Sequence, residues 1–174
     1  KKFIKKKKSK KINLVSIGVD WDRKGMDKSI EITKTLKNKG INVTLNIIGS
    51  KKKKKKLPSY IKQIGFLNKN LKEDHEKILK ILSKSDFHIL MTKQEACGVV
   101  FAEANSCGVF NLTNDVGGVR GMIKNNFNGK LFNPNDHNNK IVNYIIQIFN
   151  DKKIFFKLRK NSLDYYKKNL SWQS

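Results

Sequence analysis

Cysteine, proline and long apolar runs are scarce in this sequence of 174 residues, which has two cysteines, Cys97 and Cys107, and two prolines. Two cysteines in a chain of this length do not make a disulfide scaffold, so we expect a reducing, cytoplasmic setting. No apolar run reaches the roughly 18 residues that a membrane-spanning helix needs. The basic start, residues 1–11, lacks the apolar segment that follows the charged start of a secretory signal.

Arginine is also rare, although the chain is strongly basic. Lysine and arginine number 38 against 14 aspartates and glutamates, which gives a formal net charge of +24. Such a charge favours polyanions, either nucleic acid or an anionic membrane surface. Arginine, whose rigid fork suits phosphates and base edges, occurs only at Arg23, Arg120 and Arg159. Because abundant lysine, asparagine and isoleucine share AT-rich codons, we attribute the charge to composition and do not expect nucleic acid to be the true partner.

Any binding to nucleic acid should be nonspecific and sensitive to salt. Lysine ammonium groups displace counterions from phosphates but are poorly suited to bidentate recognition of bases. The affinity should therefore fall steeply between low and physiological salt and be equal for two unrelated duplexes. A filter-binding titration over a salt series measures this. Tight, sequence-dependent binding at physiological salt would instead favour a basic binding module.

Short apolar segments alternate with helical patterns along the chain. Strands are predicted at residues 12–18, 43–49, 61–67, 87–91, 109–113 and 130–132. Helices are predicted at residues 29–39, 72–84 and 99–106. This alternation indicates an α/β fold, a Rossmann-like parallel sheet with helices on both faces.

Composition divides the chain into three parts. Residues 1–11 form a basic arm in which charge outweighs hydrophobicity. Residues 12–134 form the Rossmann-like domain, interrupted by six lysines at residues 51–56 that are typical of a surface loop. Residues 135–174 contain helices expected to pack on that domain. One has Ile141, Tyr144, Ile145 and Ile148 at helical spacing on one face. A second is capped by Asp151 and runs to about residue 168.

The ligand of a doubly wound sheet binds at the carboxyl ends of the strands. Unusual residues follow the predicted strand ends: Arg23, Lys24, Glu95, Gly98 and Glu103. Lys24 is placed to neutralise a diphosphate, and the amides of Gly98 and Val99 begin a helix, where anions bind. A carboxylate accepts both hydroxyls of a ribose through charge-assisted bonds. These residue types predict a site for a sugar nucleotide.

The motifs in these loops resemble those of retaining glycosyltransferases of family four, the glycosyl transferases group 1, which have the GT-B fold. Glu95 and Glu103, with seven residues between them, resemble the paired-glutamate motif of that family. The segments GVDWDRKG, EACGVVFAEANSCGV, TNDVGGV and NGKLF occur in the expected order. With the pair Ser171 and Trp172, the likeness covers residues 12–172. It implies that the chain is the C-terminal, donor-binding domain of such an enzyme.

The resemblance implies two residues with catalytic roles, Glu95 and Lys24. Lys24, helped by Arg23, would bind the diphosphate of the donor, and Glu95 would contact the donor sugar. Glu103 would bind the ribose hydroxyls. Transfer would retain the configuration of the sugar.

The resemblance also implies backbone contacts and the absence of a cofactor. The amides of Gly98 and Val99 would bind sugar or phosphate, and the segment around Gly65 and Phe66 would pack on the nucleobase. Basic residues and the helix dipole would stabilise the leaving diphosphate, so no metal would be required.

A GT-B active site lies between two domains, so the resemblance implies a missing N-terminal acceptor domain as partner. The isolated chain would then bind a nucleotide sugar weakly and transfer nothing. One alternative is a GT-B epimerase or phosphorylase. Another is a non-catalytic basic binding module for nucleic acid or for the surface of an anionic membrane, which would place the chain at the membrane periphery. The glutamate pair separates these readings, because a basic module has no need of it.

The chain departs from the family pattern at five positions. Val19 stands where the family usually has an arginine, Cys97 where it has an aromatic residue, and Phe110 where it has a proline. Arg120 and Gly121 stand where it has a proline followed by a glutamate. Cys97 is interpreted as a small buried thiol, since no neighbouring histidine or asparagine orients it as a nucleophile. His88, within a strand, is interpreted as a core or rim histidine, and Trp21 as a packing residue.

Overall fold

The computed structural model describes residues 11–49 and 57–171. The elements are β1 (Ile12–Gly18), α1 (Met26–Asn38), β2 (Val43–Gly49), β3 (Ile61–Gly65), α2 (Lys72–Lys84), β4 (Phe87–Leu90), α3 (Val99–Ser106), β5 (Phe110–Asn114), α4 (Val119–Met122), β6 (Gly129–Phe132), α5 (Asn138–Asn150), α6 (Lys152–Tyr165) and the π-helical turn η1 (Tyr166–Leu170). The expected lysine loop at 51–56, residues 1–10 of the basic arm and Trp172 lie outside the described residues.

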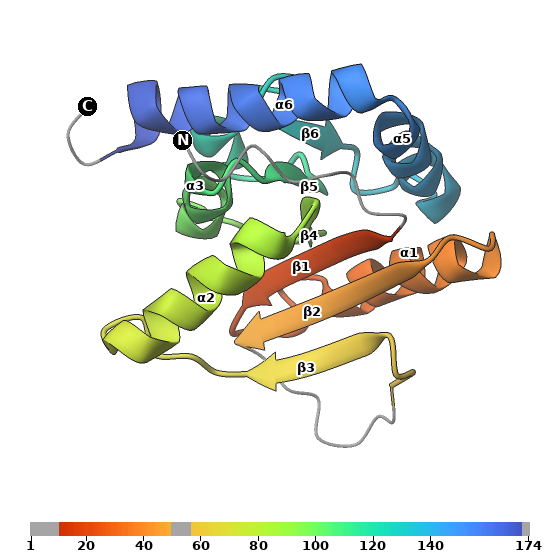
Figure 1. The fold of residues 1–174 in the computed structure, drawn as a ribbon, viewed down its shortest axis with the longest axis horizontal. Coiled ribbons are helices and arrows are strands. Elements are labelled where there is room, and N and C mark those ends of the chain that lie inside the picture. Colours follow the sequence, from red (N-terminus) through yellow and green to blue (C-terminus); the bar gives the residue numbers. More distant parts are fainter. Residues whose placement is uncertain (1–10, 50–56, 172–174) are drawn as a thin grey trace.

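The six strands form one parallel sheet in the order β3-β2-β1-β4-β5-β6 (Figure 1). Strand β1 pairs with β2 along its whole length and with β4 on its other side. The direction of winding reverses between β1 and β4, and such a switch point is where ligands bind in open α/β sheets. The predicted Rossmann-like α/β fold is confirmed.

Each face of the sheet has its own core. On β1, Ile12 and Leu14 belong to the larger core with residues of α1 and α5. Val15 and Ile17 belong to the smaller core with residues of α2 and α3. Side chains of a strand point alternately to opposite faces, so β1, in which every residue but Asn13 is buried, is covered on both sides.

The predicted C-terminal helices are α5 and α6. Helix α5 packs on α1, and α6 contacts both α5 and α3 (Figure 1). Asp151 caps α6, because its carboxylate accepts a hydrogen bond of 2.9 Å from the amide of Ile154. Helix α6 ends at Tyr165, before the expected residue 168, and the chain continues as η1. None of the helices in residues 11–49 and 57–171 is long and apolar enough to cross a membrane.

Two element ends differ from the prediction at places that shape the site. Helix α1 begins at Met26 instead of residue 29, because Gly25 adopts a left-handed φ of 62° and the helix follows it directly. Strand β3 ends at Gly65 instead of residue 67, since Gly65 has a φ of 89° that turns the chain out of the sheet. As a result, Lys24 and Phe66 both lie in loops at the carboxyl edge of the sheet.

Candidate functional site

The loops that follow β1 and β4 are fastened together at the switch point. A β-carbon on Gly25 would lie 1.9 Å from the carbonyl oxygen of Met91, so only glycine permits this approach. The carbonyl of Arg23 accepts hydrogen bonds from Thr92 Oγ1 at 3.1 Å and from the amide of Lys93 at 2.8 Å. These contacts hold the two loops side by side.

Lys24 and Glu95 form a buried ion pair across these loops. Lys24 Nζ donates to Glu95 Oε2, and the two side chains are 9% and 7% exposed. The lysine stem lies over Gly18, where a β-carbon would be 2.7 Å from Lys24 Cγ. Two charges this far removed from water are stable only as partners. Arg23 is more exposed, and its Nη1 donates to the carbonyl of Gln94 at 3.2 Å.

Two glycines after β5 fix the loop that carries Glu95. β-carbons on Gly117 and Gly118 would lie 2.3 Å and 1.7 Å from the carbonyl oxygens of Glu95 and Ala96, respectively. The amide of Gly118 donates to the Glu95 carbonyl at 2.8 Å. The paired glycines of the sequence therefore support the glutamate by close backbone packing.

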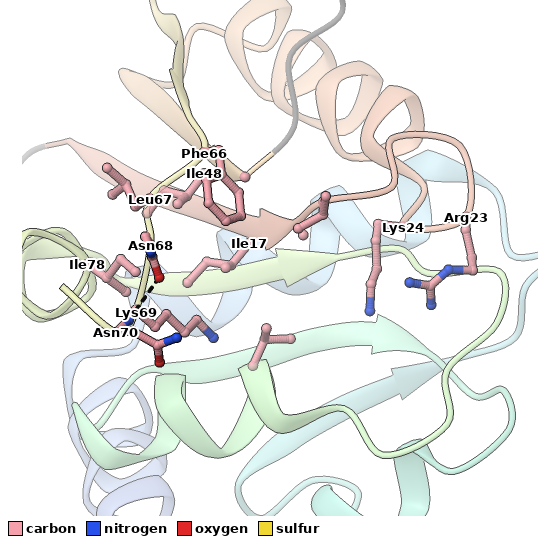
Figure 2. A pocket seen from close by; sticks show the side chains of 14 residues that line it. Ile17, Arg23, Lys24, Ile48, Phe66, Leu67, Asn68, Lys69, Asn70 and Ile78 are labelled. Atoms are coloured by element: carbon pink, nitrogen blue, oxygen red, sulfur yellow. Dashed lines mark hydrogen bonds between the residues drawn. The ribbon is translucent and has the colours of Figure 1, made fainter. Parts of the chain in front are cut away.

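A pocket of about 410 Å³ opens at this edge of the sheet (Figure 2). It is lined by Ile17, Gly18, Val19, Arg23, Lys24, Ile48, Gly49, Phe66, Leu67, Asn68, Lys69, Asn70, Ile78 and Val100. Figure 2 shows Arg23 and Lys24 on one side of the pocket and the loop of Phe66 and Lys69 on the other. Phe66 is 66% exposed, so its ring is accessible to a ligand. Cations beside an open aromatic ring suit a ligand with both negative charge and a flat ring.

Helix α3 brings a dipole and a carboxylate to the same edge. It begins after Gly98, whose φ is 68°, and Val99 at its first position is 53% exposed. The first amides of a helix have no partner inside it and favour an anion. Glu103, on the second turn, accepts a hydrogen bond of 2.5 Å from Lys69 Nζ. Val99 and Glu103 line a second hollow of about 680 Å³ beside α2 and η1.

The structure gathers the predicted residues around two adjoining hollows. Lys24, Arg23 and Phe66 line the first, and Gly65 is the residue before Phe66. Glu95 is joined to that pocket through its ion pair with Lys24. Glu103 lines the second hollow and is joined to the first through Lys69. Lys69 could not be singled out from the sequence, because no motif contains it and lysine is abundant throughout this chain.

The interpretation of Cys97 as a buried thiol is wrong, since Cys97 is exposed in the loop after β4 and Cys107 is the buried cysteine. Burial raises the pKa of the Cys107 thiol. Trp21 is a core residue, as interpreted, and is 8% exposed. His75, on α2, is exposed. Within the described part of the chain, no three His, Cys, Asp or Glu side chains are grouped as a metal site.

A buried polar network lies beneath α3. His88 Nδ1 lies 2.7 Å from Asn111 Oδ1 and donates to it. Asn111 Nδ2 donates to the carbonyl of Phe101 at 3.1 Å and to Asn105 Oδ1 at 3.0 Å. The network thus joins β4 and β5 to the helix that carries Glu103. His88 is fully buried, and this burial lowers its pKa from 6.5 to about 4.

The buried His88 should make the fold sensitive to acid. Below pH 6.5 the unfolded chain binds a proton at this position, whereas the folded chain does so only near pH 4. Stability therefore falls as the pH falls through this window, by about 3 kcal/mol at 1.4 kcal/mol per unit. Denaturant unfolding as a function of pH measures this loss. His88→Gln should flatten the profile, and His75→Gln should not; equal slopes for both variants would remove His88 as the cause.

The chain is similar in sequence to known proteins. A family model described as "Glycosyl transferases group 1" matches residues 1–169. An uncharacterized glycosyltransferase, MJ1178 of Methanocaldococcus jannaschii, is 24% identical over 162 residues, a match that covers 90% of this chain and 43% of that protein.

Several solved structures are similar in fold. WaaG, a glycosyltransferase involved in lipopolysaccharide biosynthesis, has a TM-score of 0.76 at 20% identity, over 92% of this chain and 44% of WaaG. Alr3699/HepE of Anabaena, in complex with UDP and glucose, has a TM-score of 0.74 at 16% identity, over 92% of this chain and 44% of HepE. The C-terminal domain of LpcC from Francisella tularensis has a TM-score of 0.68 at 20% identity, over 91% of this chain and 85% of that domain. The chain thus spans less than half of WaaG and HepE.

Proposed function

Because the chain belongs to the glycosyl transferases group 1 family, we propose that it is the donor-binding domain of a glycosyltransferase and binds a nucleoside-diphosphate sugar. The pocket between the loops of β1 and β3 carries this proposal. It combines Lys24 and Arg23 on one side with the exposed ring of Phe66 on the other. Two carboxylates adjoin it, each paired with a lysine of the pocket.

Each part of a sugar nucleotide has a matching group at this edge of the sheet. Lys24 and Arg23 would bind the diphosphate by charge-assisted hydrogen bonds. Phe66 would pack on the nucleobase, because an exposed ring offers a face for stacking. Glu103 would accept the ribose hydroxyls, and Glu95 would contact the sugar. The UDP and glucose in the HepE structure support a ligand of this kind.

In the proposed reaction an acceptor hydroxyl oxygen bonds to the anomeric carbon and gives up its proton, while the bond from that carbon to the diphosphate oxygen breaks and negative charge grows on the diphosphate. The ammonium of Lys24 and the start of α3 would stabilise that charge. Lys24 would turn from Glu95 to a phosphate oxygen, and sugar hydroxyls would take its place as hydrogen-bond donors to Glu95. We further propose retention of configuration without a bound metal, as the motif resemblance implies. The acceptor would bind in a second domain that faces this edge of the sheet.

Glu103→Gln should weaken the binding of the nucleotide sugar by roughly 1–3 kcal/mol, because the amide is a poorer acceptor for the ribose hydroxyls than the carboxylate. A thermal-shift screen against UDP-, GDP- and ADP-sugars selects the donor, and calorimetry then compares the variant with the wild type. Glu76→Gln, exposed on α2, is the matched control and should bind as the wild type does. Unchanged affinity in Glu103→Gln would remove Glu103 from the site.

A further inference from the structure

Lys69 stands between the two hollows of the site. It lines the 410 Å³ pocket together with Lys24. Its Nζ donates to Glu103 Oε1, and Glu103 lines the 680 Å³ hollow. Figure 2 shows the lysine extending from the loop after β3 into the pocket, across from Lys24. Two ammonium groups therefore reach one pocket from opposite loops.

The backbone around Lys69 is fixed, whereas its side chain can move. The amide of Asn68 donates to Asp74 Oδ2 at 2.8 Å, and the amide of Asn70 donates to Asn68 Oδ1 at 3.1 Å. The Lys69 side chain is 42% exposed and that of Glu103 is 26% exposed. An ion pair in contact with solvent contributes little, so its separation costs little.

Glu103 is not ready to receive ribose hydroxyls while Lys69 is bound to it. Oε1 already accepts the ammonium. Oε2 is buried and has no hydrogen-bond partner among the described residues. A buried acceptor without a donor is unfavourable, and a ligand hydroxyl would satisfy it. The free chain thus holds the carboxylate in a closed arrangement that a ligand has to open.

Building on the proposed function, we propose that Lys69 is a donor-binding residue that changes partner. It pairs with Glu103 in the free chain and moves to a phosphate oxygen of the nucleoside diphosphate in the complex. A diphosphate carries more negative charge than one carboxylate, so the exchange is favourable. It also releases Glu103 for the ribose, which couples recognition of the phosphates to recognition of the sugar ring. A nucleoside without phosphates has to displace Lys69 and offers it no new partner.

Lys69→Met, which keeps the length of the side chain and removes its charge, separates the two roles. The affinity for the nucleoside diphosphate should fall about tenfold, the effect of one lost charge-assisted hydrogen bond. The affinity for the nucleoside should rise, by up to about fivefold, because the competitor of the ribose is gone. Lys69→Arg should restore most of the diphosphate affinity. Lys80→Met, exposed on α2, is the matched control and should alter neither affinity.

NMR titrations of the chain with UDP, GDP and ADP and with the three nucleosides measure both affinities. Opposite signs for diphosphate and nucleoside in Lys69→Met support the exchange. A fall for both ligands, or no change for either, contradicts it and leaves the proposed function intact. Failure of the wild-type chain to bind any of the three diphosphates refutes the proposed function and the exchange together.

Discussion

Lys24→Met should lower the free energy of unfolding by about 3–5 kcal/mol and abolish the binding of nucleoside diphosphates. Removal of the ammonium leaves the carboxylate of Glu95, which is 7% exposed, without its partner. Breaking one side of a buried ion pair costs this much because an uncompensated charge stays out of water. Denaturant unfolding followed by circular dichroism measures the stability, and calorimetry measures the binding.

The double variant Lys24→Met/Glu95→Leu separates stability from function. With both charges removed, most of the lost stability should return, since apolar residues of similar volume replace buried pairs at little cost. The donor should still not bind, because both groups assigned to it are gone. Lys93→Met, an exposed lysine in the loop after β4, should match the wild type in stability. Equal stability of Lys24→Met and the wild type would show that the pair is not buried in solution.

Gly25→Ala should destabilise the fold by about 2–4 kcal/mol, from left-handed strain and overpacking together. The residue has a φ of 62°, which an alanine adopts only with strain. Its β-carbon would also lie 1.9 Å from the Met91 carbonyl oxygen, a backbone atom that no change of rotamer can move. The loops of β1 and β4 would have to separate, so donor binding should weaken as well.

Two other glycines separate the cost of backbone strain from the cost of overpacking. Gly40 has a φ of 77° but no atom within 4 Å of its β-carbon position, so Gly40→Ala reports the backbone strain alone. Gly121 has neither positive φ nor a close neighbour, and Gly121→Ala should be nearly neutral. Thermal unfolding of the three variants should rank Gly25→Ala as the least stable. If Gly25→Ala and Gly40→Ala were equally stable, the close approach of the two loops would be wrong.

The helices with the clearest sequence signals have the predicted bounds. The predicted ranges 72–84 and 99–106 match α2 and α3. Helix α3 ends just before Gly108, whose left-handed φ of 63° is typical of a helix C-terminus. The early start of α1 was missed for a physical reason. No serine, threonine, aspartate or asparagine occupies the capping position, and left-handed Gly25 begins the helix in its place.

The topology of the sheet predicted which loops form the site, but not which side chains meet there. Periodicity assigned Glu103 to a helix beside the strand ends, yet its ion pair joins it to Lys69, which comes from a loop 34 positions earlier in the chain. Such a long-range contact depends on how α3 and the loop after β3 pack. Gly117 and Gly118 likewise come from a distant part of the chain to pack against the backbone of Glu95 and Ala96, a contact that no local pattern predicts.

We expect a nucleoside-diphosphate sugar to bind between the loops of β1 and β3. The most direct measurement is a titration of the isotope-labelled chain with the nucleotide sugar that raises its melting temperature most, followed by NMR. We expect the largest shifts at Lys24, Phe66, Lys69 and Val99, with saturation at one site. Shifts confined to the lysines on the outer surface of α6, or no shift with any of the UDP-, GDP- and ADP-sugars, would contradict donor binding at this site.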